Sequence, residues 1–485
     1  MKLKNFSLSS LLIIAGVLMS CESTPGNNYQ EVFDAGEFTK ARASITHIFA
    51  TNQTLDPQER LEMEFLLERM NRIEKDFTKT RKAVVAEIKE TIPDVSDEDI
   101  RRWEESKALE FRIIDGEKRY FNRAARNLFR IDPTAKAIWE EKHPEQEMTS
   151  GSGAKLELDK HYAQIIRAVE TTGQRYVKPI RMRITQSIDV EPGVVPEGEM
   201  IRAWIPFPRY IRGRQVDISL KKATPAQYIL APSKEALQRT IYFQAPALND
   251  EPTHFQVSYE YTSYGMYAPV MAESVEPLQE SEKLAPYLAE EPPHIVFTPE
   301  LRKLSERLLQ GEQNPYRKAQ ILFEWVDNNI PWASAREYST IGEICTYAYE
   351  NGHGDCGIQT LLFITLCRMN GIPAKWQSGW EFQPPDDSMH DWGVIYFEPY
   401  GWVPMDVTYG LRNAKEQALR WFYLSGMDSY RLIFNDAVSQ PFFPAKIFPR
   451  SETIDSQRGE VEWRGGNLYF DQWDWNLAWE VLETS

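Results

Sequence analysis

Apolar residues change their spacing along this chain near residue 175, and that change limits the folds open to it. Between residues 61 and 92 they recur every three or four positions, which is the period of an amphipathic helix. Between residues 182 and 190 they alternate with polar residues, which is the period of a half-buried strand. Three further alternating runs follow, at 201–207, 241–243 and 255–261. The pattern predicts a multidomain α+β chain, with an N-terminal helical domain over 30–150 and an antiparallel β-sandwich over 175–265.

The first twenty residues are typical of a targeting segment rather than of a folded one. Lys2 and Lys4 precede a short apolar run, and the run ends at Leu18-Met-Ser-Cys21. Such a run is too short to span a bilayer and is the size of a signal-peptide core. We therefore expect a signal peptide over 1–20, a lipidated Cys21 with a tether over 21–29, and export to the periplasmic or cell-surface side of a bacterial membrane. An ordinary signal peptide without lipidation is the alternative.

The charge balance narrows the range of partners. The chain has 55 basic and 71 acidic residues, a formal net charge of −16. Nucleic acids and anionic membranes attract clustered Lys and Arg, so neither is an expected partner, and membrane contact is expected through the lipid anchor alone. No paired-cysteine spacing, His-Glu-x-x-His motif or Gly-rich phosphate loop occurs, and we expect neither metal nor cofactor.

One cysteine lies where a helix is expected to begin. Gly-His353-Gly-Asp-Cys356 leads into an apolar run that Gly371 ends, which predicts a helix of about four turns with Cys356 in its first turn. Unpaired N–H groups at a helix N-terminus favour a thiolate and can stabilise an oxyanion. Cys367 has the surroundings of a core residue, and Cys345 is undecided.

A histidine and an aspartate follow on two expected strands. His390 stands at the head of a strand over 392–397, and Asp406 ends the next strand, after a turn at 399–401. Adjacent antiparallel strands can place the two side chains together. We expect His390 to hydrogen-bond Asp406 through one ring nitrogen and Cys356 through the other, as a nucleophile, base and orienting acid require.

These motifs together resemble the transglutaminase-like superfamily. The marks are Gly-Asp-Cys356 at a helix start, Gly371-Ile-Pro-Ala after that helix, His390-Asp-Trp392 on a strand, and Gly401-Trp-Val-Pro-Met-Asp406. The resemblance covers about 295–410. It implies a papain-like α+β catalytic domain in which Cys356, His390 and Asp406 are the triad.

Two positions depart from the family pattern. Val394 stands where the family often has a carboxylate, and no Gln or Trp just upstream of Cys356 is identifiable as the side chain that completes an oxyanion hole. Four residues are candidates for the oxyanion hole or for substrate contacts, and they are Tyr347, Tyr349, His353 and Trp392. For His353 a solvated loop position is the simpler expectation.

Residues 411–485 are rich in aromatic side chains. Such side chains can stack on sugars or peptides, but they more often form a core, and the hairpin-like pattern near 459–470 favours a β-rich extension packed on the catalytic domain.

The sequence thus predicts a cysteine-nucleophile amide hydrolase or acyltransferase, which acts on peptide or cell-wall peptide amides through a thioester. We expect hydrolysis rather than cross-linking, because an acceptor amine requires a site that excludes water. A catalytically silent binding or scaffold lipoprotein of the cell envelope is the alternative. A disulfide that silences Cys356 is a third reading.

Overall fold

The computed structural model describes residues 28–144, 158–279 and 281–484. The predicted signal peptide and Cys21 lie outside these residues. The described chain divides into two compact units: one holds the residues up to Met63 together with Ile113–Glu117, and the other holds Glu64–Arg112 and Lys118 onward. Within the described ranges, none of the helices combines the length and apolar character that a bilayer span requires.

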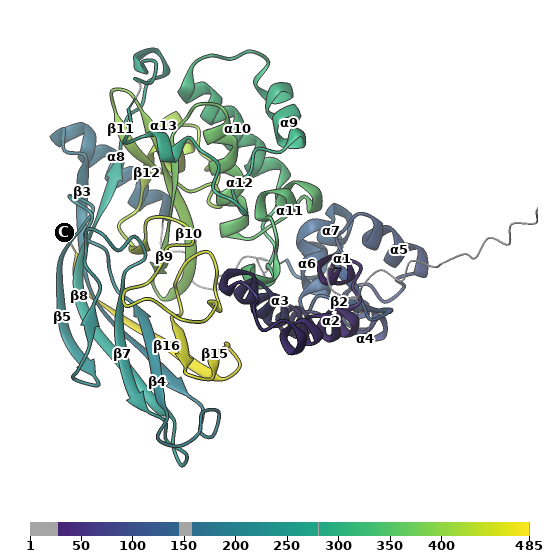
Figure 1. Ribbon diagram of the computed structural model, residues 1–485. Helices are drawn as coiled ribbons and strands as arrows, with labels where there is room; N and C mark the ends of the chain where they lie inside the picture. Colours follow the sequence, from purple (N-terminus) through teal and green to yellow (C-terminus); the bar gives the residue numbers. More distant parts are fainter. Residues whose placement is uncertain (1–27, 145–157, 280, 485) are drawn as a thin grey trace, which may run out of the picture. The chain divides into compact units, whose positions relative to one another are not determined.

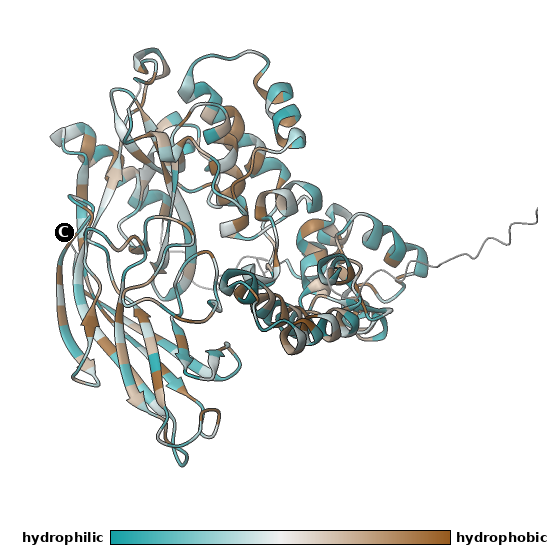
Figure 2. Cartoon of the chain, viewed as in Figure 1, coloured by the Kyte–Doolittle hydropathy of each residue, from teal (hydrophilic) through white to brown (hydrophobic). Residues whose placement is uncertain are grey.

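The expected helical region is helical, with one short hairpin. Its elements are α1 (Tyr29–Asp34), α2 (Phe38–Thr51), α3 (Pro57–Asp76), α4 (Arg81–Thr91), α5 (Asp97–Glu105), β1 (Phe111–Ile114), β2 (Glu117–Tyr120), α6 (Ala124–Ile131) and α7 (Pro133–Lys142). Ser96 and Asp99 form a reciprocal capping box at the start of α5, whose residues are mainly hydrophilic (Figure 2).

The alternating runs form a sandwich of two antiparallel sheets. One sheet has the order β12-β8-β3-β16, with β5 also paired to β8, and the other has the order β15-β14-β4-β7-β6. The strands are β3 (Tyr176–Val190), β4 (Met200–Pro206), β5 (Gln215–Thr224), β6 (Ile229–Leu230), β7 (Thr240–Pro246), β8 (Thr253–Tyr267), β12 (Gly426–Met427), β14 (Glu460–Trp463), β15 (Gly466–Leu468) and β16 (Trp473–Thr484). Inward residues of both sheets form one apolar core, which explains the alternation in sequence.

The residues after 410 do not form an extension of their own. Their strands join three different sheets, because β16 pairs with β3, β14 with β4, and β13 (Arg431–Asn435) with β9 of the catalytic sheet. The aromatic side chains of this segment are therefore mostly core residues of sheets that begin far upstream. The remaining domain limits expected from the sequence stay predictions.

The Cys356 region is a helical layer against a four-stranded antiparallel sheet of order β11-β10-β9-β13 (Figure 1). Its elements are α9 (Pro299–Leu309), α10 (Pro315–Asn329), η3 (Tyr338–Thr340), α11 (Ile344–Asn351), α12 (Cys356–Met369), β9 (Ala374–Gln383), β10 (Asp386–Phe397) and β11 (Gly401–Met405). Further helices are α8 (Leu158–Thr172) and the short η1 (Ala272–Ser274), η2 (Ala285–Tyr287), α13 (Gln417–Arg420) and α14 (Phe422–Ser425). The fold is mixed α+β with N-terminal helices and antiparallel sheets, as predicted.

Candidate active site

Cys356 begins helix α12. The side chain of Asp355 caps the helix by accepting a hydrogen bond from the Ile358 N–H at 3.1 Å, and Gly371, with φ of +77°, follows its last turn. Every residue from Gly357 to Arg368 is buried, and Figure 2 shows the helix covered with hydrophobic residues. Cys356 itself is partly exposed, so the only cysteine of this helix that solvent reaches is the one at its N-terminus.

His390 on β10 lies beside Asp406, the residue that follows β11. Antiparallel pairing sets Gly393 opposite Met405, and this register brings His390 Nε2 to 2.7 Å from Asp406 Oδ2. Burial lowers the pKa of His390, but Asp406 and Glu381 outweigh it and leave that pKa raised. Burial raises the pKa of Asp406, but His390 and Arg431 outweigh it and leave that pKa lowered. Both groups therefore favour the charged pair.

Arg431 on β13 holds Asp406 from the other side. Its guanidinium lies 2.9 Å from Asp406 Oδ2 and 2.9 Å from Asp428 Oδ2, and it is completely buried. The guanidinium also lies 5.1 Å from the ring centroids of Trp392 and Tyr409. The carboxylate of Asp406 is thus fixed by two cationic partners, which orients the imidazole of His390.

The sulfur of Cys356 contacts Asp391, the residue after His390. Cys356 Sγ donates to Asp391 Oδ2 at 3.3 Å, and the backbone N–H of Asp391 hydrogen-bonds to the same sulfur. The Thr360 hydroxyl donates to the Asp391 carbonyl oxygen at 3.3 Å, so α12 runs along this part of β10. The thiol therefore lies beside the peptide unit that joins His390 to Asp391.

This geometry corrects one expectation. Of the two hydrogen bonds predicted for His390, the bond to Asp406 is present, but no hydrogen bond joins its ring to Cys356 among the described residues. Alternation along a strand explains the difference, because Asp391 and Gly393 face α12 while His390 and Trp392 face the opposite side. An ideal Cβ on Gly393 would come 3.6 Å from Ile364 of α12, which locates that face.

The electrostatic surroundings of Cys356 are acidic. Burial raises the pKa of its thiol well above the ordinary value, and the nearby carboxyls of Asp391 and Asp355 raise it further. The Asp391 backbone N–H acts in the opposite direction. Burial also raises the pKa of Asp355, to about 6. The Cys356 thiolate can be stable here only if the carboxyls of Asp391 and Asp355 are protonated or accept hydrogen bonds from other groups.

Tyr338 lies against the nucleophile end of α12. Its hydroxyl is 2.7 Å from Asp355 Oδ1 and 3.3 Å from Asp391 Oδ2. An ideal Cβ on Gly357 would come 2.1 Å from this hydroxyl, so only glycine allows the close approach. No motif in the sequence points to Tyr338, which lies on the short helix η3.

The four residues expected at the oxyanion hole or in substrate contacts make other contacts in the structure. Tyr347 donates to Glu110 Oε2 at 3.0 Å, and Tyr349 packs at the edge of the helical core. His353 is buried against the ring of Tyr347, contrary to the solvated loop expected for it, and burial lowers its pKa. Trp392 is buried and donates to Gln377 Oε1 at 3.3 Å. The hydroxyl beside Cys356 thus belongs to Tyr338 rather than to Tyr347 or Tyr349.

The segment 436–459, between β13 and β14, supplies two more residues to the site. Gln457 Nε2 donates to Asp391 Oδ1 at 2.8 Å and to the His390 carbonyl oxygen at 3.1 Å. Asp455 accepts from the Ser378 hydroxyl, and its carboxyl raises the pKa of Asp391. Both residues lie about 50 positions beyond the last predicted motif, in a segment without periodicity.

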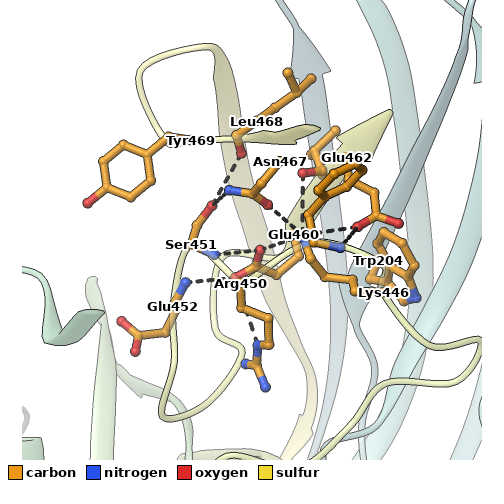
Figure 3. Close-up of polar contacts among 12 residues, drawn as sticks. Trp204, Lys446, Arg450, Ser451, Glu452, Glu460, Glu462, Asn467, Leu468 and Tyr469 are labelled. Carbon is orange, nitrogen blue, oxygen red and sulfur yellow. Dashed lines mark hydrogen bonds and ion pairs between the residues drawn. The ribbon is translucent and has the colours of Figure 1, made fainter. Parts of the chain in front are cut away.

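A buried charged cluster anchors this segment to β14 (Figure 3). Lys446 Nζ lies 3.1 Å from Glu460 Oε2 and 2.6 Å from Asn467 Oδ1. Glu460 also accepts from the backbone N–H groups of Ser451 and Glu452 at 2.9 and 2.7 Å. These contacts keep the segment, and with it Asp455 and Gln457, in one conformation.

The three cysteines that the structure describes are all free thiols. Cys367 is a core residue as expected, and Cys345 is also buried and contacts the Thr365 hydroxyl at 2.9 Å. A disulfide among these three, the reading that would silence Cys356, is therefore absent. Over the same residues, no group of three or more His, Cys, Asp or Glu could hold a metal ion.

A cysteine at a helix N-terminus, set against a sheet that carries a His–Asp pair, is the arrangement of papain-like cysteine hydrolases and acyltransferases. Residues 302–407 match the model of the transglutaminase-like superfamily. This part of the chain is a transglutaminase-like domain, as its motifs predict.

Individual relatives are distant. The uncharacterized protein YebA of Bacillus subtilis is 24% identical over 132 residues, which are 23% of this chain and 18% of that protein's length. A candidate cysteine protease from Cytophaga hutchinsonii has a crystal structure with 16% identity and a TM-score of 0.44, over 64% of this chain and 94% of that one. The periplasmic domain of TgpA from Pseudomonas aeruginosa has 13% identity and a TM-score of 0.26, over 49% and 93% of the respective chains.

Proposed function

We propose that this protein is a cysteine-dependent amide hydrolase in which Cys356 is the nucleophile, His390 the base and Asp406 the orienting acid. The observation that carries the proposal is the position of the Cys356 sulfur. It lies at the start of α12 and beside the His390–Asp391 peptide unit, while Asp406 and Arg431 fix the imidazole.

The reaction would proceed in two halves. A base takes the thiol proton as Cys356 attacks an amide carbonyl, and the leaving amine receives that proton as the thioester forms; His390 fills this role in a state in which its imidazole is neutral and turned toward the sulfur. Water then attacks the thioester and releases the acid. Transfer to an acceptor amine would follow the same first half, and we favour hydrolysis because Cys356 is partly exposed to water.

We further propose a peptide or protein substrate, cell-wall peptides included, and a location outside the cytoplasm. The location rests on the targeting pattern of residues 1–20 and on Cys21 as a lipidation site, both read from the sequence. The lipid would hold the protein on a bacterial membrane, on the periplasmic or cell-surface side.

One observation favours the alternative of a catalytically silent binding lipoprotein. The pKa of Cys356 is raised by burial and by two carboxyls, and a thiol that stays protonated is a poor nucleophile. A silent relative would tolerate these surroundings, whereas an enzyme must neutralise them.

Thiol reactivity separates the two functions. We expect iodoacetamide to modify Cys356 at neutral pH much faster than Cys345 or Cys367, which are buried and whose pKa values burial raises, that of Cys345 to about 12. A library of peptide and cell-wall peptide amides is then screened with the wild type and with Cys356→Ala. Turnover that survives Cys356→Ala, or a Cys356 no more reactive than its neighbours, would reject the enzyme.

A further inference from the structure

Two carboxyl groups meet beside the Cys356 sulfur. Asp391 and Asp455 are 3% and 1% exposed, and Asp455 accepts a hydrogen bond from Ser378, the residue that pairs with Asp391 across β9 and β10. Two buried carboxylates this near to each other repel, so one of them is expected to be a carboxylic acid. The pair is therefore a proton-bearing group within reach of the proposed nucleophile.

The neighbours of the pair decide which member holds the proton. Five groups face Asp391: Asp355 and Cys356 at the start of α12, Tyr338 of η3, and Asp455 and Gln457 of the 436–459 segment. The charged groups that surround this set are Glu337, Glu452, Arg450 and Arg458.

The positive charges act on Asp455. Burial raises the pKa of Asp455, but the hydrogen bond from the Ser378 hydroxyl and the charges of Arg450 and Arg458 act in the opposite direction. Burial and then the carboxyls of Asp455 and Asp355 raise the pKa of Asp391 well above its ordinary value. The negative charge is therefore expected on Asp455 and the proton on Asp391.

We propose that Asp391 is a further catalytic residue, a neutral carboxylic acid whose O–H donates a hydrogen bond to the Cys356 thiolate. This inference rests on the proposed role of Cys356 as nucleophile. A neutral Asp391 supplies the hydrogen-bond donor that the acidic surroundings of the thiolate otherwise lack. Its Oδ2 lies 3.3 Å from the sulfur, where it can accept from the thiol or donate to the thiolate.

The proton accounting is simple. In the resting thiol, the S–H donates to Asp391 Oδ2. When the base takes that proton, the sulfur becomes an acceptor and the Asp391 O–H turns from Asp455 to it; Asp391 keeps its own proton, and Asp455 keeps the Ser378 hydroxyl as its donor. An ionised Asp391 at this distance would instead oppose the thiolate. Gln457 keeps the carboxyl in place by donating to Oδ1, the oxygen on the other side.

Two substitutions at Asp391 test the role. Asparagine can accept from Gln457 through its carbonyl and donate to the sulfur through its amide, as the protonated acid does, whereas alanine can do neither. We expect the alkylation rate of Cys356 at pH 7 to stay within about threefold in Asp391→Asn and to fall about tenfold to hundredfold in Asp391→Ala, the usual worth of a hydrogen bond to a charged group. Asp386→Asn, on the same strand, is the matched control and should not change the rate.

Other outcomes overturn the inference. A rate that rises in both Asp391 variants means that Asp391 is ionised and opposes the thiolate. A rate that falls equally in both means that the carboxyl acts in another way, and a rate unchanged in both means that Asp391 has no role. Each result leaves the proposed function standing, which fails instead if wild-type Cys356 is unreactive.

Infrared spectroscopy of the wild type gives a second reading that does not depend on how the variants fold. Burial also raises the pKa of Asp76 to about 7 and that of Glu452 to about 8, so we expect a protonated-carboxyl absorption at neutral pH with one component that is lost in Asp391→Asn and kept in Asp386→Asn. Asp455→Asn should move the titration of this band to lower pH, because it removes a neighbouring negative charge. A neutral-pH spectrum in which no such band depends on Asp391 would overturn the inference.

Discussion

Arg431 Nη1 lies 2.9 Å from Asp406 Oδ2, and both side chains are fully excluded from solvent. The same guanidinium pairs with Asp428, so one arginine compensates two buried carboxylates. A strand after the family-matched segment thus completes the acid end of the proposed triad.

Removal of this arginine should be costly. Arg431→Met leaves Asp428 without its paired cation and Asp406 with His390 alone, and we expect the free energy of unfolding to fall by about 3–5 kcal/mol, the usual cost of breaking a buried ion pair. Urea unfolding followed by circular dichroism measures the change. Arg464→Met removes an exposed pair with Glu199 and should leave the midpoint unchanged. Equal stability of Arg431→Met and wild type would mean that the ion pair is not formed.

The parts of the site that could be predicted are those specified locally. The capping aspartate before Cys356 and the glycine after the helix determine α12 from within a segment of some twenty residues. The nearness of His390 and Asp406 follows from strand order and a short turn, since consecutive antiparallel strands pair.

The parts that could not be predicted depend on long-range pairing. Nothing in the alternation of residues 473–484 shows that they pair with β3, nearly 300 positions upstream. Arg431 directly precedes an apolar run in the sequence, and this position indicates only weakly that its charge is buried. Asp391 could have been found, because the residue after a strand histidine faces the other side of the sheet, where the helix packs.

The His390–Asp406 pair should make stability depend on pH in a definite window. The pKa of His390 is raised, so its charged form contributes fully below its ordinary pKa of 6.5, and the contribution is lost as pH rises through the raised value. The pKa of Asp406 is lowered, so its contribution is present above its ordinary 3.8 and is lost as pH falls through the lowered value.

The free-energy difference between wild type and His390→Gln should therefore be largest between pH 3.8 and 6.5 and shrink on either side. Urea titrations across this range measure it. His254→Gln, which removes an exposed pair with Asp189, is the control and should give a small difference throughout. A difference that keeps growing above pH 7 would contradict the charged pair.

The buried cluster of Figure 3 should stabilise the segment that carries Asp455 and Gln457. Lys446→Met leaves Glu460 and Glu462 close together without the lysine, and we expect a loss of about 3–5 kcal/mol in unfolding free energy. Amide hydrogen exchange over 436–459 should rise with it. Adding Glu460→Gln should recover part of the stability, because one uncompensated charge is removed. Lys415→Met, at an exposed lysine, serves as the control, and equal exchange in Lys446→Met and wild type would contradict the anchoring role.

Substitution of Gly357 tests how closely Tyr338 and Asp391 approach the start of α12. In most helix interiors, Gly→Ala stabilises by up to about 1 kcal/mol. Here the new Cβ would come 2.1 Å from the Tyr338 hydroxyl and 2.7 Å from Asp391 Oδ2, so one of these groups must move. We expect Gly357→Ala to lower the unfolding free energy by about 1–3 kcal/mol and to slow alkylation of Cys356.

The cause of that loss can be separated from a general helix effect by a second substitution. In a Tyr338→Ala background the phenol is gone, and Gly357→Ala should cost less than it does in the wild type, because the nearest obstacle has been removed. Unfolding free energies of the four proteins in this cycle measure the coupling. If the penalty is the same with and without the tyrosine, or if Gly357→Ala stabilises the wild type, the hydroxyl does not lie against the helix start. Tyr338 would then have to be removed from the site.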